Sequence, residues 1–267
     1  MGSDDDVLAH YEDRYNEDER LKKDPLGRLE LLRTRLILDR YLPPPPASLL
    51  DVGGGPGIYS TVLADDGYDV ELIDIVPRHI REATERGVRA QLGDARELPS
   101  APSTQDAVLL LGPLYHLQER EDRIQALREA VRVGRVGAPV FGAAISRYAS
   151  AIDGLDSGYW DDPNFAEIVL QDLEHGQHQN PTGDPQYFTT AYFHRPDDLR
   201  REFKKAGLRD VSVLAVEGIA WAAADLDERL GDDKKRASLF GLLERLETEP
   251  SILGASPHLL GIGFVAG

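Results

Sequence analysis

A glycine-rich turn after an apolar segment is the part of this chain best suited to chemistry. Residues 49–52 read as a buried strand that contains Asp51, and residues 53–57 have the sequence Gly-Gly-Gly-Pro-Gly. Glycine carries no Cβ and adopts positive φ, so such a turn lets backbone amides approach a ligand closely. Residues 58–64 are predicted to form a helix whose N-terminus offers unpaired N–H groups. Together the three segments predict a nucleotide-binding turn.

The glycine spacing and Asp51 indicate which class of ligand the turn binds. A dinucleotide turn has the pattern G-x-G-x-x-G, whose third glycine packs the helix against the sheet. Here Gly53, Gly55 and Gly57 alternate, and Ile58 stands in the place of that third glycine. The negative charge of Asp51 disfavours a pyrophosphate and suits a cationic or amine-bearing ligand. The turn resembles motif I of the class I S-adenosylmethionine-dependent methyltransferases, whose ligand carries a sulfonium and an ammonium but no phosphate.

Two further acids follow predicted strands, as they do in that family. Asp74 ends a strand predicted over 68–74, where a carboxylate can accept hydrogen bonds from both hydroxyls of a ribose. The resemblance implies this role for Asp74 and places Ile75 near the adenine. It also implies that Asp94 accepts a hydrogen bond from the exocyclic amino group of the adenine. The cofactor-binding residues that the resemblance implies in this part of the chain are Asp51, Gly53, Gly55, Gly57, Asp74, Ile75, Asp94, Ala95 and Leu111.

The N-terminal region supplies further cofactor-binding candidates. Residues 13–41 are predicted to be largely helical. Small-molecule methyltransferases often fold such a helix over the cofactor, with a tyrosine near the methyl group and an arginine on the methionine carboxylate. The resemblance therefore points to Tyr11 or Tyr15 and to Arg33. A charged, solvent-facing helix with a few packing tyrosines is the alternative.

The turn after the fourth predicted strand, 112–117, holds the candidates for acting on a substrate, because in the family this place faces the transferred methyl group. His116 is the best candidate for a general base, since histidine titrates near neutrality. Tyr115 would orient the acceptor or line the sulfonium pocket. A structural loop histidine is the alternative for His116. No metal site is expected, although three other histidines could in principle face one: His175, His178 and His194.

Composition restricts the partners. The chain has 267 residues, enough for a sizeable core, and reads as one domain with additions. The absence of cysteine excludes disulfides, thiolate metal sites and cysteine nucleophiles. A net charge of -17 disfavours nucleic acid and anionic membranes as partners. No apolar run approaches the roughly 18 residues of a membrane span, and the first residues do not resemble a signal peptide, so a cytoplasmic protein is expected.

The acceptor is expected to be a small molecule with an aromatic or apolar body. Enzymes that methylate exocyclic amines of nucleic-acid bases carry an Asn/Asp-Pro-Pro-aromatic turn, whereas residues 112–115 read Gly-Pro-Leu-Tyr. Carbon methylation of cytosine uses a cysteine nucleophile, which this chain lacks. A protein substrate and a homodimer stay open, as does the choice among oxygen, nitrogen, carbon and sulfur as the methylated atom.

Strands and helices alternate from residue 49 onward, which predicts a doubly wound, Rossmann-like α/β fold. The resemblance implies a seven-stranded, mostly parallel sheet with an antiparallel last strand. An apolar stripe is expected on the N-terminal helix, formed by Leu29, Leu32, Leu36 and Ile37. Three parts are expected: an N-terminal helical cap over 1–45, a core over 46–146 and 196–267, and an inserted, aromatic-rich substrate cap over 147–195. A packing subdomain that never touches substrate is the alternative for the insert.

The residues and the resemblance together predict an enzyme that moves a methyl group from S-adenosylmethionine to a small metabolite by in-line transfer, with S-adenosylhomocysteine as product. Two other functions stay open. One is an NAD-dependent oxidoreductase on a related fold, which the glycine spacing and Asp51 disfavour. The other is a regulatory protein that binds the cofactor without turnover.

Overall fold

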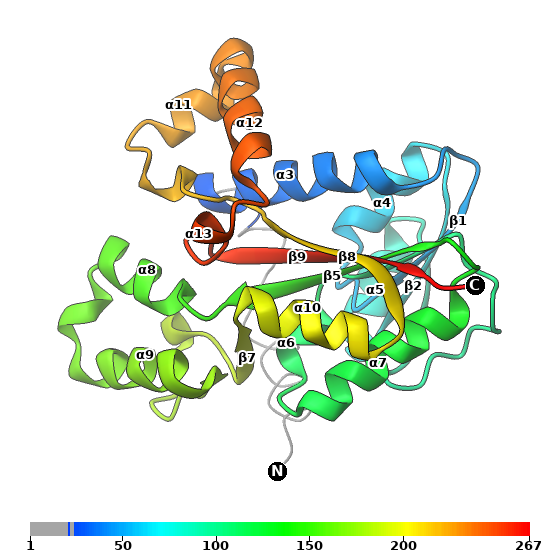
Figure 1. The fold of residues 1–267 in the computed structure, drawn as a ribbon, viewed down its shortest axis with the longest axis horizontal. Helices are drawn as coiled ribbons and strands as arrows, with labels where there is room; N and C mark the ends of the chain where they lie inside the picture. The colour runs from blue at the N-terminus through cyan, green and yellow to red at the C-terminus, as the bar shows by residue number, and fades with distance from the viewer. Residues whose placement is uncertain (1–20, 22–23) are drawn as a thin grey trace.

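The computed structural model describes residue 21 and residues 24–267, and within them one mixed sheet is covered by helices on both faces (Figure 1). The strands are β1 (Ser48–Val52), β2 (Asp69–Asp74), β3 (Arg89–Leu92), β4 (Ala107–Leu110), β5 (Pro139–Ser146), β6 (Gln177–His178), β7 (Ala191–His194), β8 (Leu208–Ala215) and β9 (His258–Val265). The α-helices are α3 (Pro25–Tyr41), α4 (Ile58–Asp65), α5 (Pro77–Glu85), α6 (Pro113–His116), α7 (Arg120–Val133), α8 (Ala149–Asp156), α9 (Pro163–His175), α10 (Pro196–Lys205), α11 (Leu226–Gly231), α12 (Asp233–Leu246) and α13 (Pro250–Leu253). Short 3-10 helices are η1 (Tyr159–Asp161), η2 (Pro185–Tyr187) and η3 (Ala220–Ala222).

The main strands run in the order β3-β2-β1-β4-β5-β9-β8. Those from β3 to β5 are parallel, and β9 runs antiparallel between β5 and β8. The inner strand β4, Ala-Val-Leu-Leu, is buried at every position because helices cover both faces of the sheet. The predicted α/β fold with an antiparallel closing strand is therefore confirmed.

Two apolar layers hold the helices on the sheet. On one face α7 and α10 contribute Leu127 and Phe203 to the largest buried cluster. On the other face α3 and α4 contribute Ile37 and Leu63 to a second cluster. No helix among the described residues combines the length and apolar composition needed to cross a membrane.

The buried face of α3 differs from the predicted stripe. Leu29 and Ile37 are fully buried, but Leu32 and Leu36 are 38% and 39% exposed. The centre of the buried face is instead Arg33, whose guanidinium is neutralised inside the protein. The buried face of a helix is predicted wrongly from its apolar residues when a buried cation lies at the centre of that face. The part of the predicted helix before Pro25 lies outside the described residues, apart from residue 21 and the N-cap Asp24.

The segment predicted as an inserted cap contains helices and a strand. Helices α8 and α9 lie together at one end of the molecule (Figure 1). Ala151 of α8 packs against a small core formed by Phe165, Ile168 and Val169 of α9 and by Tyr187. Strand β7, near the end of this segment, pairs in parallel with the last residues of β5. Since β9 occupies the other edge of β5 there, β7 continues the sheet beyond the end of β4.

A second helical addition between β8 and β9 was not anticipated from the sequence. It comprises η3, α11, α12 and α13, and in Figure 1 α11 and α12 project beyond the sheet next to α3. Its apolar residues form a cluster with Leu29 of α3, namely Ala220, Leu226, Leu230, Leu239 and Leu243. The N-terminal helix therefore packs against this segment as well as against the sheet.

Phe203 of α10 lies in a slot made by glycines of two neighbouring strands. A Cβ placed at Gly142 of β5 or at Gly261 of β9 would come within 2.8 Å of its ring, and one at Gly263 within 3.3 Å. The missing side chains let the ring lie against the backbone of the sheet, where it is fully buried. This contact fixes α10 on the sheet.

Phe203→Ala is expected to lower the free energy of unfolding by about 3–5 kcal/mol, because the glycine slot cannot collapse into the space left by the ring. Denaturant unfolding followed by circular dichroism measures the change. The matched control is Leu170→Ala on α9, where the side chain is 59% exposed and the change should stay within about 0.5 kcal/mol. If Phe203→Ala lowered the free energy of unfolding by less than about 1 kcal/mol, the ring would not be held by the glycine slot as described.

Candidate active site

The glycine turn leaves β1 in a conformation that only glycine adopts readily. Gly53, Gly55 and Gly57 have φ values of 66°, 57° and 85°. The amide of Gly53 donates to the carbonyl of Ile73 at 2.6 Å, so the turn begins alongside the end of β2. Gly57 then caps α4 with left-handed backbone geometry. The turn is thereby directed across the carboxyl ends of the parallel strands.

Asp51 is a fully buried carboxylate beneath this turn. Its Oδ2 accepts from the hydroxyl of Ser60 at 2.6 Å, whereas Oδ1 has no hydrogen-bond partner among the described residues. Burial raises the pKa of Asp51 to about 6; the bond from Ser60 opposes the rise, and the charge of Asp74 adds to it. A carboxylate in this state is stabilised by a cation that reaches its open oxygen.

Asp74, at the end of β2, ties the glycine turn to the second strand. Its Oδ2 accepts from the amide of Gly55 at 2.9 Å, and its Oδ1 accepts from the amide of Val76 at 2.8 Å. Nδ1 of His79 lies 3.2 Å from the same Oδ1. A carboxylate offers about four acceptor positions, so these contacts leave capacity for a ligand hydroxyl. Asp74 and the neighbouring Ile75 both line the cavity.

Asp94 follows β3 and is held by an arginine two residues away. Its oxygens accept from Nε and Nη2 of Arg96 at 3.0 and 2.6 Å, and the amide of Arg96 donates at 2.8 Å. Burial alone would raise the pKa of Asp94, but the hydrogen bonds and charge of Arg96 lower it below the usual value. Asp94 is therefore a fixed, ionised acceptor on the cavity wall.

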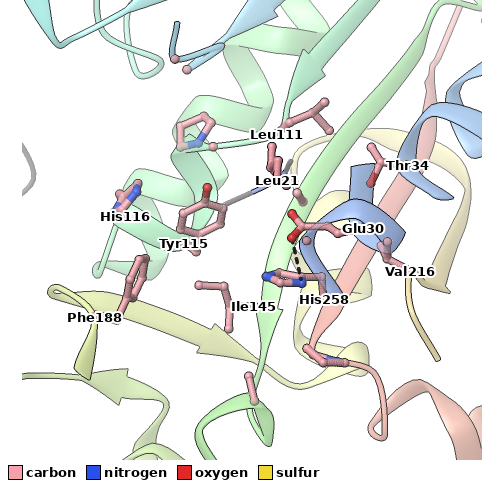
Figure 2. Close-up of a pocket in the computed structure, with 18 of the residues that line it drawn as sticks. Leu21, Glu30, Thr34, Leu111, Tyr115, His116, Ile145, Phe188, Val216 and His258 are labelled. Carbon is pink, nitrogen blue, oxygen red and sulfur yellow. Dashed lines mark ion pairs between the residues drawn. The ribbon is translucent and has the colours of Figure 1, made fainter. Parts of the chain in front are cut away.

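One cavity of about 450 Å³ connects the three acids with the turn after β4. The predicted residues that line it are Asp51, Gly53, Gly55, Asp74, Ile75, Asp94, Ala95, Leu111, Tyr115 and His116. The far side of the cavity is formed by α3, by the ends of β5 and β9, and by the insert. Figure 2 shows this side: Phe188 lies beside His116, and Tyr115 faces Ile145 and His258 across the space.

The turn after β4, residues 112–117, lies directly on the glycine turn; it is called the acceptor turn below, after its predicted role. A Cβ at Gly112 would be 2.6 Å from the carbonyl oxygen of Gly53, and a Cβ at Gly53 would be 2.7 Å from Cδ of Pro113. In the short helix α6 that follows, the rings of Tyr115 and His116 lie 4.6 Å apart. The two turns thus meet through backbone atoms, with the aromatic side chains beside them.

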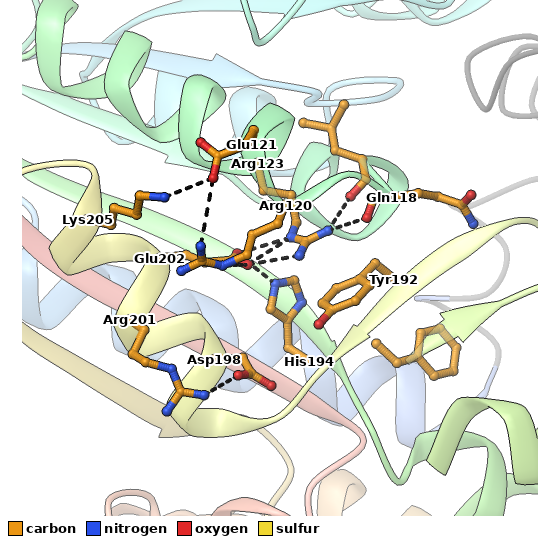
Figure 3. A network of polar contacts seen from close by, with 12 residues as sticks. Gln118, Arg120, Glu121, Arg123, Tyr192, His194, Asp198, Arg201, Glu202 and Lys205 are labelled. Carbon is orange, nitrogen blue, oxygen red and sulfur yellow. Dashed lines mark hydrogen bonds and ion pairs between the residues drawn. The ribbon is translucent and has the colours of Figure 1, made fainter. Parts of the chain in front are cut away.

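A buried polar network supports the acceptor turn from behind (Figure 3). Arg123 of α7 donates through Nη1 to the carbonyls of Leu117 and Gln118 at 2.8 and 2.7 Å, and through Nη2 to Glu202 of α10 at 2.9 Å. His194 of β7 lies 3.1 Å from the same carboxylate. Burial opposes ionisation of Glu202, but its hydrogen bonds with His194 and Arg123 lower its pKa.

Two predicted residues do not line the cavity, and others lie outside the described residues. Arg33 is only 2% exposed and does not line the cavity; it donates to Glu247 at 2.6 Å and to the carbonyl of Val216 at 3.2 Å. This corrects its expected place at a ligand carboxylate, because its charge is already satisfied inside the protein. Gly57 also does not line the cavity and acts as the helix cap. Tyr15, like Tyr11, lies outside the described residues.

The histidines that were weighed as metal ligands have other partners. Nδ1 of His178 lies 2.8 Å from Asp172, and its Nε2 lies 2.7 Å from a backbone carbonyl. His194 belongs to the network described above, and His175 is exposed. These three side chains do not meet at one site.

A polar cluster that includes two residues of the cavity wall, Glu30 and His258, was not predicted from the sequence. Glu30, Glu217 and His258 place one ligand atom each within 4.8 Å of one another. Strands β8 and β9 were both predicted, but the register that brings Glu217, just after β8, beside His258, the first residue of β9, was not. Trp221, from the unanticipated helical addition, also lines the cavity.

Comparison with known proteins agrees with this geometry. Residues 50–141, which contain the glycine turn and the three acids, match the family model of a methyltransferase domain. The chain is 28% identical over 203 residues to a ubiquinone biosynthesis O-methyltransferase of Xylella fastidiosa, covering 72% of this chain and 74% of that protein. It is 33% identical over 111 residues to a demethylmenaquinone methyltransferase of Beutenbergia cavernae, covering 41% of this chain and 45% of that protein.

The fold has a counterpart among solved structures. A protein of Thermotoga maritima described as an S-adenosylmethionine-dependent methyltransferase, possibly a histamine N-methyltransferase, superposes with a TM-score of 0.60. The two chains are 17% identical, and the match covers 97% of this chain and 99% of the other. The matched domain, the sheet order and the acids at the strand ends lead to one conclusion: residues 50–141 carry a methyltransferase domain, in a chain with the fold of the S-adenosylmethionine-dependent methyltransferases.

Proposed function

We propose that this enzyme methylates a small, uncharged and mainly apolar molecule. The observation that carries the proposal is the charge of the cavity wall. Among the described lining residues Arg96 is the only lysine or arginine, and it is already paired with Asp94. A phosphate or carboxylate on the acceptor would have no free cation to pair with. The relatives named for ubiquinone biosynthesis and for demethylmenaquinone also support a small-molecule acceptor.

The residues present fit the cofactor. The open oxygen of Asp51 suits the cationic end of S-adenosylmethionine, and a Cβ position at Gly55 has no described atom within 4 Å. Asp51, Gly53 and Gly55 would hold the methionine portion, with Asp74 at the ribose and Asp94 at the adenine. Ile75, Ala95 and Leu111 would form the apolar walls around these groups. When bound, the cofactor supplies a methyl group on a positively charged sulfur.

The protein's own contribution is alignment and exclusion of water. Holding two reactants in line contributes about 7–11 kcal/mol in well-oriented systems. Tyr115 and His116 lie on the acceptor side of the cavity, on a turn whose position is fixed against Gly53. They would position the acceptor, while Phe188 and Trp221 of the two additions would cover it.

The direct test is formation of S-adenosylhomocysteine from S-adenosylmethionine with three sets of small aromatic acceptors: neutral phenols, amines, and their carboxylated or phosphorylated analogues. Turnover is expected with uncharged acceptors and not with anionic ones. Turnover confined to anionic acceptors would contradict the proposal. Binding of S-adenosylmethionine without turnover of any set would favour a regulatory protein, and calorimetric binding of NAD alone would favour an oxidoreductase.

Cofactor affinity is expected to fall as the pH drops through about 6. The pKa of Asp51 is raised to about 6, so its carboxylate is ionised at pH 7.5 and mostly protonated at pH 5, where it no longer attracts a cation. S-adenosylmethionine should bind about tenfold more weakly at pH 5 than at pH 7.5. Calorimetric titration across this range measures it. Asp51→Asn keeps an acceptor for Ser60 and should flatten the dependence; an unchanged slope would show that another group is responsible.

Asp74→Ala is expected to weaken binding of S-adenosylhomocysteine by about 1.5–3 kcal/mol, the contribution of hydrogen bonds to a charged group. The loss should include the support that Asp74 gives to the amide of Gly55. The matched control is Asp69→Ala at the other end of β2, an exposed residue paired with Arg89, which should leave the affinity unchanged. Equal affinities in calorimetry for the wild type and Asp74→Ala would show that Asp74 does not bind the ribose.

A further inference from the structure

Glu30 of α3 and His258 at the start of β9 lie on the cavity wall beside Ile145, the end of β5 (Figure 2), and Glu217, just after β8, is buried next to them. Strands β8 and β9 are antiparallel, with Ala215 opposite Leu259, so Glu217 and His258 meet where the pair of strands ends. Glu30 reaches the same place from α3. The cluster is therefore on the acceptor side of the cavity.

The carboxylate of Glu217 orients the imidazole of His258. Glu217 is fully buried, and its Oε1 lies 2.6 Å from Nδ1 of His258. Its Oε2 accepts from the backbone N–H of His258 at 3.0 Å and from the hydroxyl of Ser256 at 2.9 Å. Because a carboxylate only accepts hydrogen bonds, Nδ1 carries a proton, and in the neutral ring the lone pair is therefore on Nε2.

The other edge of the His258 ring faces the cavity. In Figure 2 this edge is directed toward the space between Ile145 and Tyr115. The His258 side chain is 23% exposed, so a molecule in the cavity can reach it. Geometry of this kind, a buried carboxylate on one ring nitrogen and a substrate cavity at the other, is what a general base requires.

Glu30 adds a second carboxylate beside the same ring. Its Oε2 lies 3.7 Å from Nδ1 of His258, and its side chain is 16% exposed. After the imidazole takes up a proton, its positive charge lies beside two carboxylates in a partly buried site, where the attraction is stronger than in bulk water. Glu30 and Glu217 therefore favour the protonated product of the transfer.

The other histidines of the cavity are placed for different roles. Both ring nitrogens of His178 are engaged, one with Asp172 and one with a backbone carbonyl. His79 lies beside Asp74 on the cofactor side. His116 lies on another part of the cavity wall, where its ring contacts those of Tyr115 and Phe188.

We propose, building on the proposed function, that Nε2 of His258 takes the proton from a hydroxyl group of the acceptor during methyl transfer. The O–H bond breaks and its proton moves to Nε2. The acceptor oxygen bonds to the methyl carbon while the carbon–sulfur bond breaks, and that electron pair stays on sulfur as a neutral thioether. The imidazolium then releases its proton to water. Glu217 is the positioning residue for this base.

A hydroxyl is the acceptor group that makes use of such a base. A neutral amine attacks through its lone pair without first losing a proton, whereas a neutral hydroxyl is a weak nucleophile until its proton is removed. The wall near His258 is apolar and aromatic, formed by Leu111, Tyr115, Ile145, Val216, Trp221 and Leu260. The acceptor class is therefore an uncharged, planar molecule that carries a phenol- or enol-type hydroxyl.

The test uses 4-nitrocatechol, a phenol whose visible absorption shifts when it loses its proton. The full chain saturated with S-adenosylhomocysteine is titrated with it at a pH one unit below the pKa of the free probe. The wild type is expected to bind the phenolate, and His258→Asn to bind the neutral phenol. Asparagine keeps an N–H donor for Glu217 and removes Nε2. His175→Asn, the same change at an exposed position of α9 outside the cavity, should retain the phenolate band.

Kinetics with S-adenosylmethionine give a second readout. His258→Asn should lower kcat for the probe roughly 100-fold or more, the usual contribution of a general base. KM and the affinity for S-adenosylhomocysteine should change less than about threefold. The residual rate of the variant should rise with pH as the free probe ionises, whereas the wild type should depend less on pH. A purely structural role for His258 would not produce this difference.

Several results would overturn the proposal. In the wild type these are binding of the neutral phenol and absence of binding or methylation of the probe. Among the variants it is loss of the phenolate band in His116→Asn but not in His258→Asn. Tight binding of Mn²⁺ that His258→Asn abolishes would indicate a metal site instead of a base. Each of these leaves the proposed function standing as long as S-adenosylmethionine is bound and used with another acceptor. Failure of the wild type to bind S-adenosylmethionine would contradict the proposed function itself.

Discussion

The backbone contact between the glycine turn and the acceptor turn fixes how far apart these two turns lie, and the site depends on that distance. Gly112 lies so close to the carbonyl of Gly53 that a Cβ there would come within 2.6 Å of the oxygen, and Pro113 would collide with any side chain at Gly53. In the function proposed above, one turn would face the cofactor and the other the acceptor. Since in-line transfer loses efficiency with small misalignment, a contact between backbone atoms suits this task better than one between flexible side chains.

Behind this contact, the buried pair of Arg123 and Glu202 holds the acceptor turn in place. A buried ion pair adds little net stability, because the loss of hydration offsets most of the attraction. Its effect here is geometric: Arg123 uses its remaining donors on the carbonyls of Leu117 and Gln118, which end the acceptor turn. Because His194 of β7 contacts the same carboxylate, the strand that ends the insert and the acceptor turn share one support (Figure 3).

Local signals in the sequence predicted much of this architecture, and long-range contacts account for what was missed. The glycine turn and the acids that end β1, β2 and β3 were predictable because each is encoded within a few neighbouring residues. The burial of Arg33 was not, since its partner Glu247 lies 214 residues away along the chain. The pairing of Glu217 with His258 likewise needs the register of β8 with β9, which element order alone does not supply.

Carboxylates lie at both ends of the path that charge follows in this reaction. Methyl transfer removes a positive charge from sulfur and, with a hydroxyl acceptor, releases a proton at the other end of the cavity. Asp51, with one oxygen open, lies beneath the glycine turn that faces the cationic cofactor. Glu217 and Glu30 flank His258, where the proposed proton would arrive. An acidic cavity wall is therefore suited both to binding the cationic methyl donor and to accepting the proton that the acceptor loses.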